Sequence, residues 1–154
     1  HQGIIEKVKM KIKNWPGKPI LVQTESEKYD AFSASNVALA ASGTVSLELA
    51  LANVPTVIAY KLSPITAWFV KKAIKVKYIN LINLILDKNA VPELLQENCC
   101  PKLLAENVTR LLDYPEIAKS QSYDFKSALE LLTNAEKDLP SVQAAKVISQ
   151  ILRK

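Results

Sequence analysis

Apolar and polar positions alternate in short blocks through the first half of the chain. Residues 3–14 carry apolar side chains at helical spacing with lysines between them, which predicts an amphipathic helix. A short β-branched run at 19–23 follows a turn rich in proline and glycine and predicts a strand. We expect a short helix over 27–34 and then a second apolar strand over 36–41.

Gly43 interrupts the apolar run and separates two periodicities. The pattern over 44–54 predicts a helix, which proline ends, and 55–60 then predicts a buried strand. A further helix is expected over 63–75 and a last short strand over 77–81. Because continuously apolar strands return through helices, the expected fold class is α/β, with a parallel sheet covered on both faces.

After residue 88 the pattern becomes helical. We predict a loop over 82–89 and then helices over 90–98, 101–113, 115–133 and 140–153, with no further strand. No internal repeat or low-complexity tract interrupts the chain.

The composition fits one compact domain: 154 residues, 49% hydrophobic and 23% charged. A net charge of +5 allows a nucleotide, a nucleic acid or an anionic membrane as partner and selects none of them. No apolar stretch reaches the roughly 18 residues of a membrane span, and the first residues have no apolar signal core. The chain begins with His1 rather than Met, so we expect the natural protein to extend upstream.

The two cysteines, Cys99 and Cys100, are adjacent. Neighbouring cysteines rarely reach disulfide geometry without strain, so a reduced, cytoplasmic setting is expected. They have no companion histidine or cysteine at metal-ligand spacing, so no metal site is expected. The single histidine is terminal and is not expected to be catalytic.

Ser42, Gly43 and Thr44 lie where a strand leads into a helix. Ligands of parallel sheets bind at such turns, and a helix start favours an anion such as a diphosphate. Glu48, four residues after Thr44, shares its helical face, and its carboxylate suits the hydroxyls of a ribose. Ordinary helix capping is the alternative, although the capping position for an acid is occupied by Leu47. The spacing leaves both interpretations open.

Several linked segments, found in order from 36 to 113, resemble the C-terminal part of the lipid-A-disaccharide synthases, bacterial glycosyltransferases of the GT-B type. The segments are Ala41–Glu48 (ASGTVSLE), Pro55–Ile58, Tyr60 with Lys61, Trp68 with Phe69, Leu81–Leu84 and Pro92–Gln96 (PELLQ). The sequence departs from the family pattern at Lys61, usually arginine, and at Ile82, usually proline. Asp87 and Lys88 stand in a loop that lacks the family pattern and receive no role.

The resemblance implies a Rossmann-like nucleotide-sugar-binding domain over 1–114 and a helical C-terminal extension of that domain over 115–154. It implies an inverting transfer from UDP-2,3-diacylglucosamine to 2,3-diacylglucosamine 1-phosphate, which gives lipid A disaccharide 1-phosphate and UDP. Neither a metal nor another cofactor is implied.

The resemblance also assigns roles. Ser42, Gly43 and Thr44 would cradle the diphosphate of UDP, Glu48 would hold the ribose, and Asn83 would contact the nucleotide. The catalytic base belongs to the N-terminal domain of such enzymes, so no catalytic residue is expected here and the chain alone is expected to be inactive.

The implied partners are the two acylated sugars, the N-terminal domain, and the cytoplasmic surface of the inner membrane, where the enzyme would be peripheral. Residues 63–75, with Trp68 and Phe69 beside lysines, suit either a membrane interface or a core helix. The helices after 115 would form a homodimer. The alternatives are a murein-precursor transferase or a UDP-sugar epimerase of the same fold and, less favoured, a basic nucleic-acid-binding module, for which no motif is seen.

Overall fold

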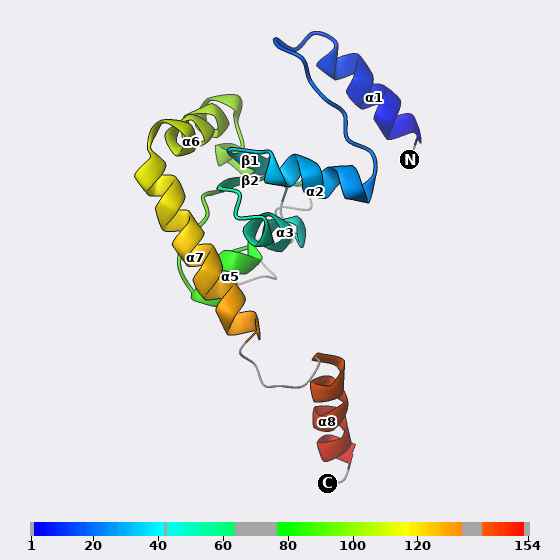
Figure 1. Cartoon of the computed structure of the whole chain (residues 1–154), viewed down its shortest axis with the longest axis vertical. Coiled ribbons are helices and arrows are strands. Elements are labelled where there is room, and N and C mark those ends of the chain that lie inside the picture. Colours follow the sequence, from blue (N-terminus) through cyan, green and yellow to red (C-terminus); the bar gives the residue numbers. More distant parts are fainter. Residues whose placement is uncertain (1, 42, 64–76, 134–139, 153–154) are drawn as a thin grey trace. The chain divides into compact units, whose positions relative to one another are not determined.

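The computed structural model describes residues 2–41, 43–63, 77–133 and 140–152 (Figure 1). It divides into two compact units, His1–Ser35 and Asn36–Lys154. Unit 1 contains the helices α1 (Gln2–Ile12) and α2 (Glu25–Ser33).

Unit 2 contains the sheet, and its elements follow one another in this order: β1 (Ala38–Ala40), α3 (Val45–Leu51), β2 (Thr56–Tyr60), α5 (Leu81–Leu86), β3 (Glu93–Leu95), the 3₁₀ turn η1 (Gln96–Asn98), α6 (Pro101–Asp113), α7 (Pro115–Thr133) and α8 (Pro140–Leu152). No helix in the described ranges is long and apolar enough to cross a membrane.

A complete capping box begins α2. The Thr24 side chain accepts from the Glu27 backbone N–H at 3.3 Å, and the Glu27 carboxylate accepts from the Thr24 backbone N–H at 3.2 Å. The hydrogen bond from the Thr24 hydroxyl, followed by those from the backbone, lowers the pKa of Glu27. The helix therefore starts at Glu25, two residues before the predicted start.

The predicted strand over 19–23 is wrong, because the structure forms no strand there. A strand needs a neighbour that accepts and donates its backbone hydrogen bonds. The described part of unit 1 contains helices and no strand, and Ile20 is 89% exposed. An apolar, β-branched composition was insufficient to define a strand at this position.

The parallel sheet predicted for the first half is confirmed. It has three strands in the order β1-β2-β3, with Ala38 paired to Thr56 and Ile58 paired to Glu93, and both pairings are parallel. The predicted strands at 36–41 and 55–60 correspond to β1 and β2, and the predicted helix at 44–54 corresponds to α3. The fold class is therefore α/β.

Two predictions after β2 are wrong. Residues 77–81 are not a strand, and α5 begins at Leu81 and occupies most of the predicted loop at 82–89. The cause is Asn80, whose Oδ1 accepts from the backbone N–H groups of Ile82 at 2.8 Å and Asn83 at 3.3 Å and so caps α5. The predicted helix at 63–75 lies outside the described residues from 64 onward.

The predicted helix over 90–98 is also wrong, because it contains β3 and η1. The sequence PELLQEN is composed largely of good helix formers, but Glu93–Leu95 pairs with β2 and completes the sheet. Pairing with a buried neighbour outweighs a helix preference of a few tenths of a kcal/mol per residue. The predictions of α6, α7 and α8 are confirmed to within one residue at each end.

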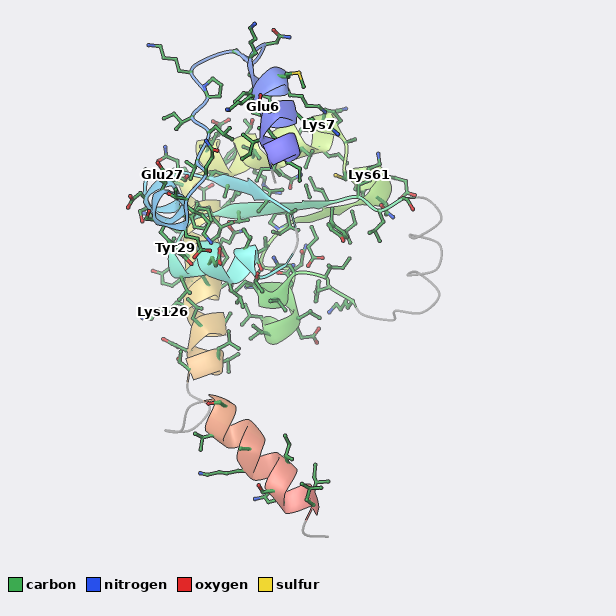
Figure 2. All side chains as sticks on the ribbon, turned by 90° about the vertical axis from the view of Figure 1, so that its right-hand side faces the viewer. Glu6, Lys7, Glu27, Tyr29, Lys61 and Lys126 are labelled. Carbon is green, nitrogen blue, oxygen red and sulfur yellow. The ribbon has the colours of Figure 1, made fainter. Side chains whose placement is uncertain are left out.

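Alternate residues of β2 define two hydrophobic layers. Ile58 points into a cluster formed with Ala50, Ile82, Val91, Phe125 and Ala128, which come from α3, α5, α7 and the residues before β3. Its neighbour Val57 lies in a second cluster with Leu94 and Leu111, which α6 helps to form. Figure 2 shows α6 on one side of the strands and α3 and α5 on the other. Helices therefore cover both faces of the sheet, as predicted.

One side-chain amide joins α7 to the start of β2. Gln121 is 3% exposed; its Oε1 accepts from the Thr56 N–H at 2.5 Å and its Nε2 donates to the Thr56 carbonyl at 3.1 Å. The same Nε2 donates to the Ala90 carbonyl at 3.2 Å. Gln121 thus pairs with Thr56 as a neighbouring strand would.

Replacing Gln121 with alanine leaves the buried N–H and C=O of Thr56 without these partners. We expect the free energy of unfolding to fall by about 3 kcal/mol, since each unsatisfied buried group costs about 1–3 kcal/mol. Urea unfolding followed by circular dichroism measures this change. Gln150→Ala, at an exposed position of α8, is the matched control, and equal stability of the two variants would contradict the role of Gln121.

Candidate functional site

The carboxyl ends of the three strands meet at one edge of the sheet, because the strands are parallel. The turn that contains Gly43 follows β1, Lys61 and Leu62 follow β2, and Gln96 follows β3. Lys61 is exposed there and is labelled beyond the end of β2 in Figure 2. Ligands of open parallel sheets bind at this edge, so these turns form the candidate site.

Gly43 has the backbone conformation for which glycine is suited. Its φ is 133°, a value that residues with a Cβ atom rarely adopt. A Cβ built on Gly43 would meet no atom within 4 Å. The glycine is therefore required by the backbone turn, and the space beside it is open. Ser42, the residue before it, lies outside the described residues.

Thr44 occupies the N-cap position of α3 without acting as a cap. Its φ and ψ are −62° and −26°, and its side chain makes no capping hydrogen bond. The Ser46 hydroxyl instead donates to the Gly43 carbonyl at 2.8 Å. The structure therefore does not support capping by the Thr44 side chain. Thr44 is exposed and directly follows Gly43.

Glu48 lies one helical turn further along α3. Its backbone N–H donates to the Thr44 carbonyl at 3.3 Å, which places the two residues on the same face of the helix. The Glu48 side chain is half-buried, and its Oε2 atom is shielded from solvent. The structure therefore brings Gly43, Thr44 and Glu48 together on one short segment.

Asn83 lies apart from this segment, in the core. It is fully buried, and its side chain pairs with both backbone groups of Val91: Oδ1 accepts from N–H at 2.8 Å and Nδ2 donates to C=O at 2.8 Å. Nδ2 also donates to Glu93 Oε1 at 2.7 Å. Both amide hydrogens are thus used within the protein, and a direct contact of Asn83 with a nucleotide stays a prediction.

Glu93 is a site residue to which sequence reasoning gave no role. Its carboxylate accepts from the backbone N–H groups of Ile79 at 2.9 Å and Asn80 at 3.1 Å, besides the amide of Asn83. Charged acceptors form stronger hydrogen bonds than neutral ones. The start of β3 is therefore fixed to the residues that lead into α5. In the sequence, the signal for a role of Glu93 was its place in Pro92–Gln96, one of the segments that resemble the family.

Gln96 is the second residue that sequence reasoning left without a role. Its φ is 49°, in the left-handed region, and its Oε1 accepts from the Leu62 N–H at 2.9 Å. This hydrogen bond joins the turn after β2 to the turn after β3. Two of the three strand ends are thereby held together.

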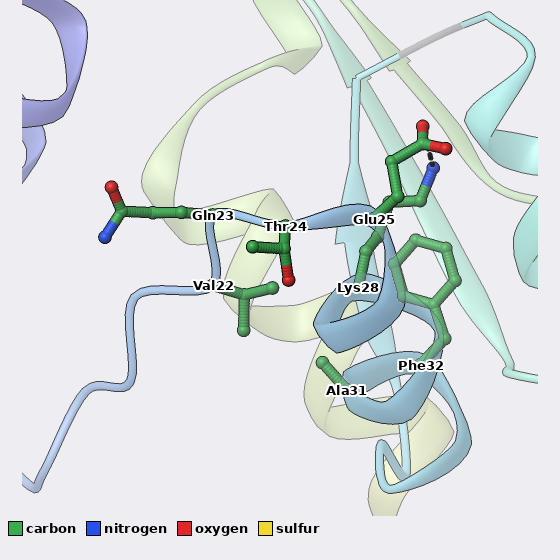
Figure 3. Close-up of a pocket in the computed structure, with 7 residues that line it drawn as sticks. All are labelled: Val22, Gln23, Thr24, Glu25, Lys28, Ala31 and Phe32. Carbon is green, nitrogen blue, oxygen red and sulfur yellow. Dashed lines mark ion pairs between the residues drawn. The ribbon is translucent and has the colours of Figure 1, made fainter. Parts of the chain in front are cut away.

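A separate pocket of about 290 Å³ lies within unit 1 (Figure 3). It is lined by Val22, Gln23, Thr24, Glu25, Lys28, Ala31 and Phe32. Two of its charged groups, Glu25 and Lys28, pair with each other at 3.6 Å. None of the residues assigned to a ligand from the sequence lines this pocket.

The described residues contain no group of three or more histidine, cysteine or acidic residues able to hold a metal ion. Both cysteines are free thiols and are half-buried.

Comparison with known proteins decides the family. The model of the family described as lipid-A-disaccharide synthetase matches residues 1–148. The chain belongs to this family. It is 42% identical to the lipid-A-disaccharide synthase of Rhodospirillum centenum over 99% of the chain and 38% of that relative. It is 39% identical to that of Gluconobacter oxydans over 82% of the chain and 30% of the relative, and 38% identical to that of Paramagnetospirillum magneticum over 99% and 39%.

The lipid-A-disaccharide synthases are glycosyltransferases, since their name describes the joining of two sugars. The chain spans between 30 and 39% of the length of these three relatives, so it corresponds to one part of such an enzyme. The resemblance noted in the sequence is thereby confirmed.

Asn83→Ala tests the structural role of the buried amide. The change removes three hydrogen bonds and leaves the backbone of Val91 without its partners. We expect the free energy of unfolding to fall by about 3 kcal/mol, measured by urea denaturation. Asn107→Ala, which removes one hydrogen bond within α6, should change it by less than about 1 kcal/mol. A loss no larger than that of the control would contradict the structural role.

Proposed function

We propose that the chain is the UDP-sugar-binding part of a lipid A glycosyltransferase. Two observations support this: membership of the lipid-A-disaccharide synthase family, and the segment at the carboxyl edge that combines an open glycine turn with a carboxylate one helical turn later. The second observation carries the assignment of the site, because nucleotides bind this edge of parallel sheets.

In this proposal the diphosphate of UDP lies at the turn of Ser42, Gly43 and Thr44. The first N–H groups of a helix lack acceptors within the helix, and the helix start carries partial positive charge. The open space beside Gly43 lets phosphate oxygens approach these groups. Glu48 then accepts hydrogen bonds from the two ribose hydroxyls, and Asn83 acts near the nucleotide.

The reaction proposed for the whole enzyme is an inverting transfer of 2,3-diacylglucosamine from UDP to 2,3-diacylglucosamine 1-phosphate. The products are lipid A disaccharide 1-phosphate and UDP. This chain contributes no catalytic base and works with a further domain that supplies one. No metal or other cofactor takes part in the proposal, since hydrogen-bond donors and lysines neutralise the departing diphosphate.

The acylated substrates place the whole enzyme at the cytoplasmic face of the inner membrane. Residues 63–75 combine aromatic side chains with lysines and are proposed to contact it. The proposed assembly is a homodimer formed through the helices after residue 115.

Calorimetric titration with UDP tests the site. We expect the chain to bind UDP and Glu48→Ala to weaken binding by about 1.5–3 kcal/mol, because a carboxylate that accepts two hydroxyls is lost. Glu130→Ala, at an exposed position of α7, should bind as the wild type does. The absence of UDP binding by the wild-type chain, or equal affinity of Glu48→Ala, would refute the proposed site.

A turnover assay tests the division of labour. The purified chain, given both acylated sugar substrates, should release no UDP and form no disaccharide, because the catalytic base lies elsewhere in the enzyme. Disaccharide formation by the chain alone, detected by mass spectrometry, would show that the catalytic residues are here.

A further inference from the structure

Lys61 places a positive charge at the carboxyl edge of the sheet. It follows β2, the central strand, and Figure 2 labels it beyond the end of that strand. The described residues that directly follow the three strands are 41, 43–44, 61–63 and 96–100, and Lys61 alone among them is positively charged. An anion that binds this edge therefore meets Lys61 as the one described cation of these segments.

No acidic side chain neutralises Lys61 within the described part of the chain. Other lysines of unit 2 are paired. Lys77 Nζ lies 3.3 Å from Asp87 Oδ1. Lys88 Nζ lies 2.8 Å from Asp124 Oδ1. Lys61 belongs to none of the ion pairs found among the described residues, and its side chain is exposed. Its charge is therefore available to an anion from outside the chain.

The backbone of Lys61 is held on both sides. The residue before it, Tyr60, ends β2 and pairs with Leu95 of β3. The residue after it, Leu62, donates its backbone N–H to Gln96 Oε1 at 2.9 Å. The backbone that carries the ammonium group is thus already ordered, and only the lysine side chain has to lose conformational freedom when it contacts a ligand.

The register of the sheet places Lys61 beside the turn of Gly43. Ala40 at the end of β1 is paired with Ile58 of β2, and Gly43 and Lys61 each come three residues after their member of this pair. The two segments therefore leave neighbouring strands, which lie about 4.8 Å apart. The flexible four-carbon stem of a lysine carries its ammonium group toward a ligand held at the neighbouring turn.

Charge indicates which part of a sugar nucleotide Lys61 meets. The uracil base, the ribose and the acylated sugar are uncharged, so the negative charge of the proposed donor lies on its diphosphate. An ammonium group donates charge-assisted hydrogen bonds to phosphate oxygens, and these are stronger than bonds to neutral acceptors. The diphosphate is also the group that the proposed function assigns to the turn of Gly43.

We propose that Lys61 donates a hydrogen bond from Nζ to a diphosphate oxygen of the bound nucleotide. This role rests on the proposed function, since that function places the nucleotide at the turn of Gly43. Lys61 is then a substrate-contacting residue that supplies the positive charge that the described part of the Gly43 turn lacks.

Calorimetric titration with UDP at low and at high ionic strength tests this role in the wild-type chain, Lys61→Gln and Lys61→Arg. We expect Lys61→Gln to weaken UDP binding by about three- to tenfold at low ionic strength, because a charge-assisted hydrogen bond at an exposed position is lost. Salt screens this interaction, so the two dissociation constants should approach each other at high ionic strength. Lys61→Arg keeps the charge and should bind UDP within about twofold of the wild type.

Lys119→Gln is the matched control. Lys119 is exposed on α7, two residues before the glutamine that bonds to the start of β2, so this variant removes the same charge at the opposite end of the strand. It should bind UDP as the wild type does. Equal weakening by Lys119→Gln and Lys61→Gln would show an effect of net charge alone and would overturn the proposed contact.

Two further results would also overturn the contact. One is a loss of affinity in Lys61→Gln that is the same at both ionic strengths or is shared by Lys61→Arg, since a change in the structure of the turn would produce it. The other is unchanged UDP affinity in Lys61→Gln, which leaves the UDP site standing. The acceptor phosphate and anionic lipid are absent from the titration, so neither accounts for an effect on UDP. Failure of the wild type to bind UDP refutes the proposed function itself, and the role of Lys61 falls with it.

Discussion

Every buried backbone group needs a hydrogen-bond partner, and a sheet of three short strands cannot supply all of them. Two side-chain amides fill the deficit. Gln121 pairs with both backbone groups of Thr56, and Asn83 pairs with both backbone groups of Val91. Each amide copies the donor and acceptor of a missing strand. The sheet, the helices on it and the turns at its carboxyl edge depend on these two pairings.

The same arrangement carries the candidate site. Asn83 is linked through Glu93 to the residues before α5, and Gln96, three residues further on, is linked to the turn after β2. The space beside Gly43 is open. The proposed nucleotide site is thus an accessible glycine turn beside a tightly bonded corner, a combination that admits a ligand and still fixes the groups that recognise it.

Periodicity predicted most of the fold, because α3, α6 and α7 each bury one face and the middle of β2 is apolar. It was wrong at Pro92–Gln96, where partner strands rather than local preference decide the structure. It also missed α5, which depends on an asparagine cap and ends at Asp87 in a left-handed conformation. The start and end of a short helix such as α5 depend on single hydrogen bonds, and the spacing of apolar residues does not reveal these.

The candidate site was predictable where its residues lie close together in the sequence. Gly43, Thr44 and Glu48 are near one another in sequence, so their juxtaposition needed only a helix between them. Glu93 and Gln96 act on residues between 10 and 34 positions away, and these pairings appear only once the sheet is assembled. The contact of Asn83 with a nucleotide remains a prediction. The domain boundary after residue 114 also remains one.

The bond between Gln121 and Thr56 joins residues 65 positions apart, and Phe125 and Ala128 complete the larger core cluster. Contacts that close long loops form late, because the chain must first lose the entropy of that loop. On a ribosome, β1 and β2 would be synthesised well before the helix that seals them. One apolar face of the sheet therefore stays incompletely covered until α7 has been synthesised. During that interval the nascent chain is most exposed to aggregation and most in need of a chaperone.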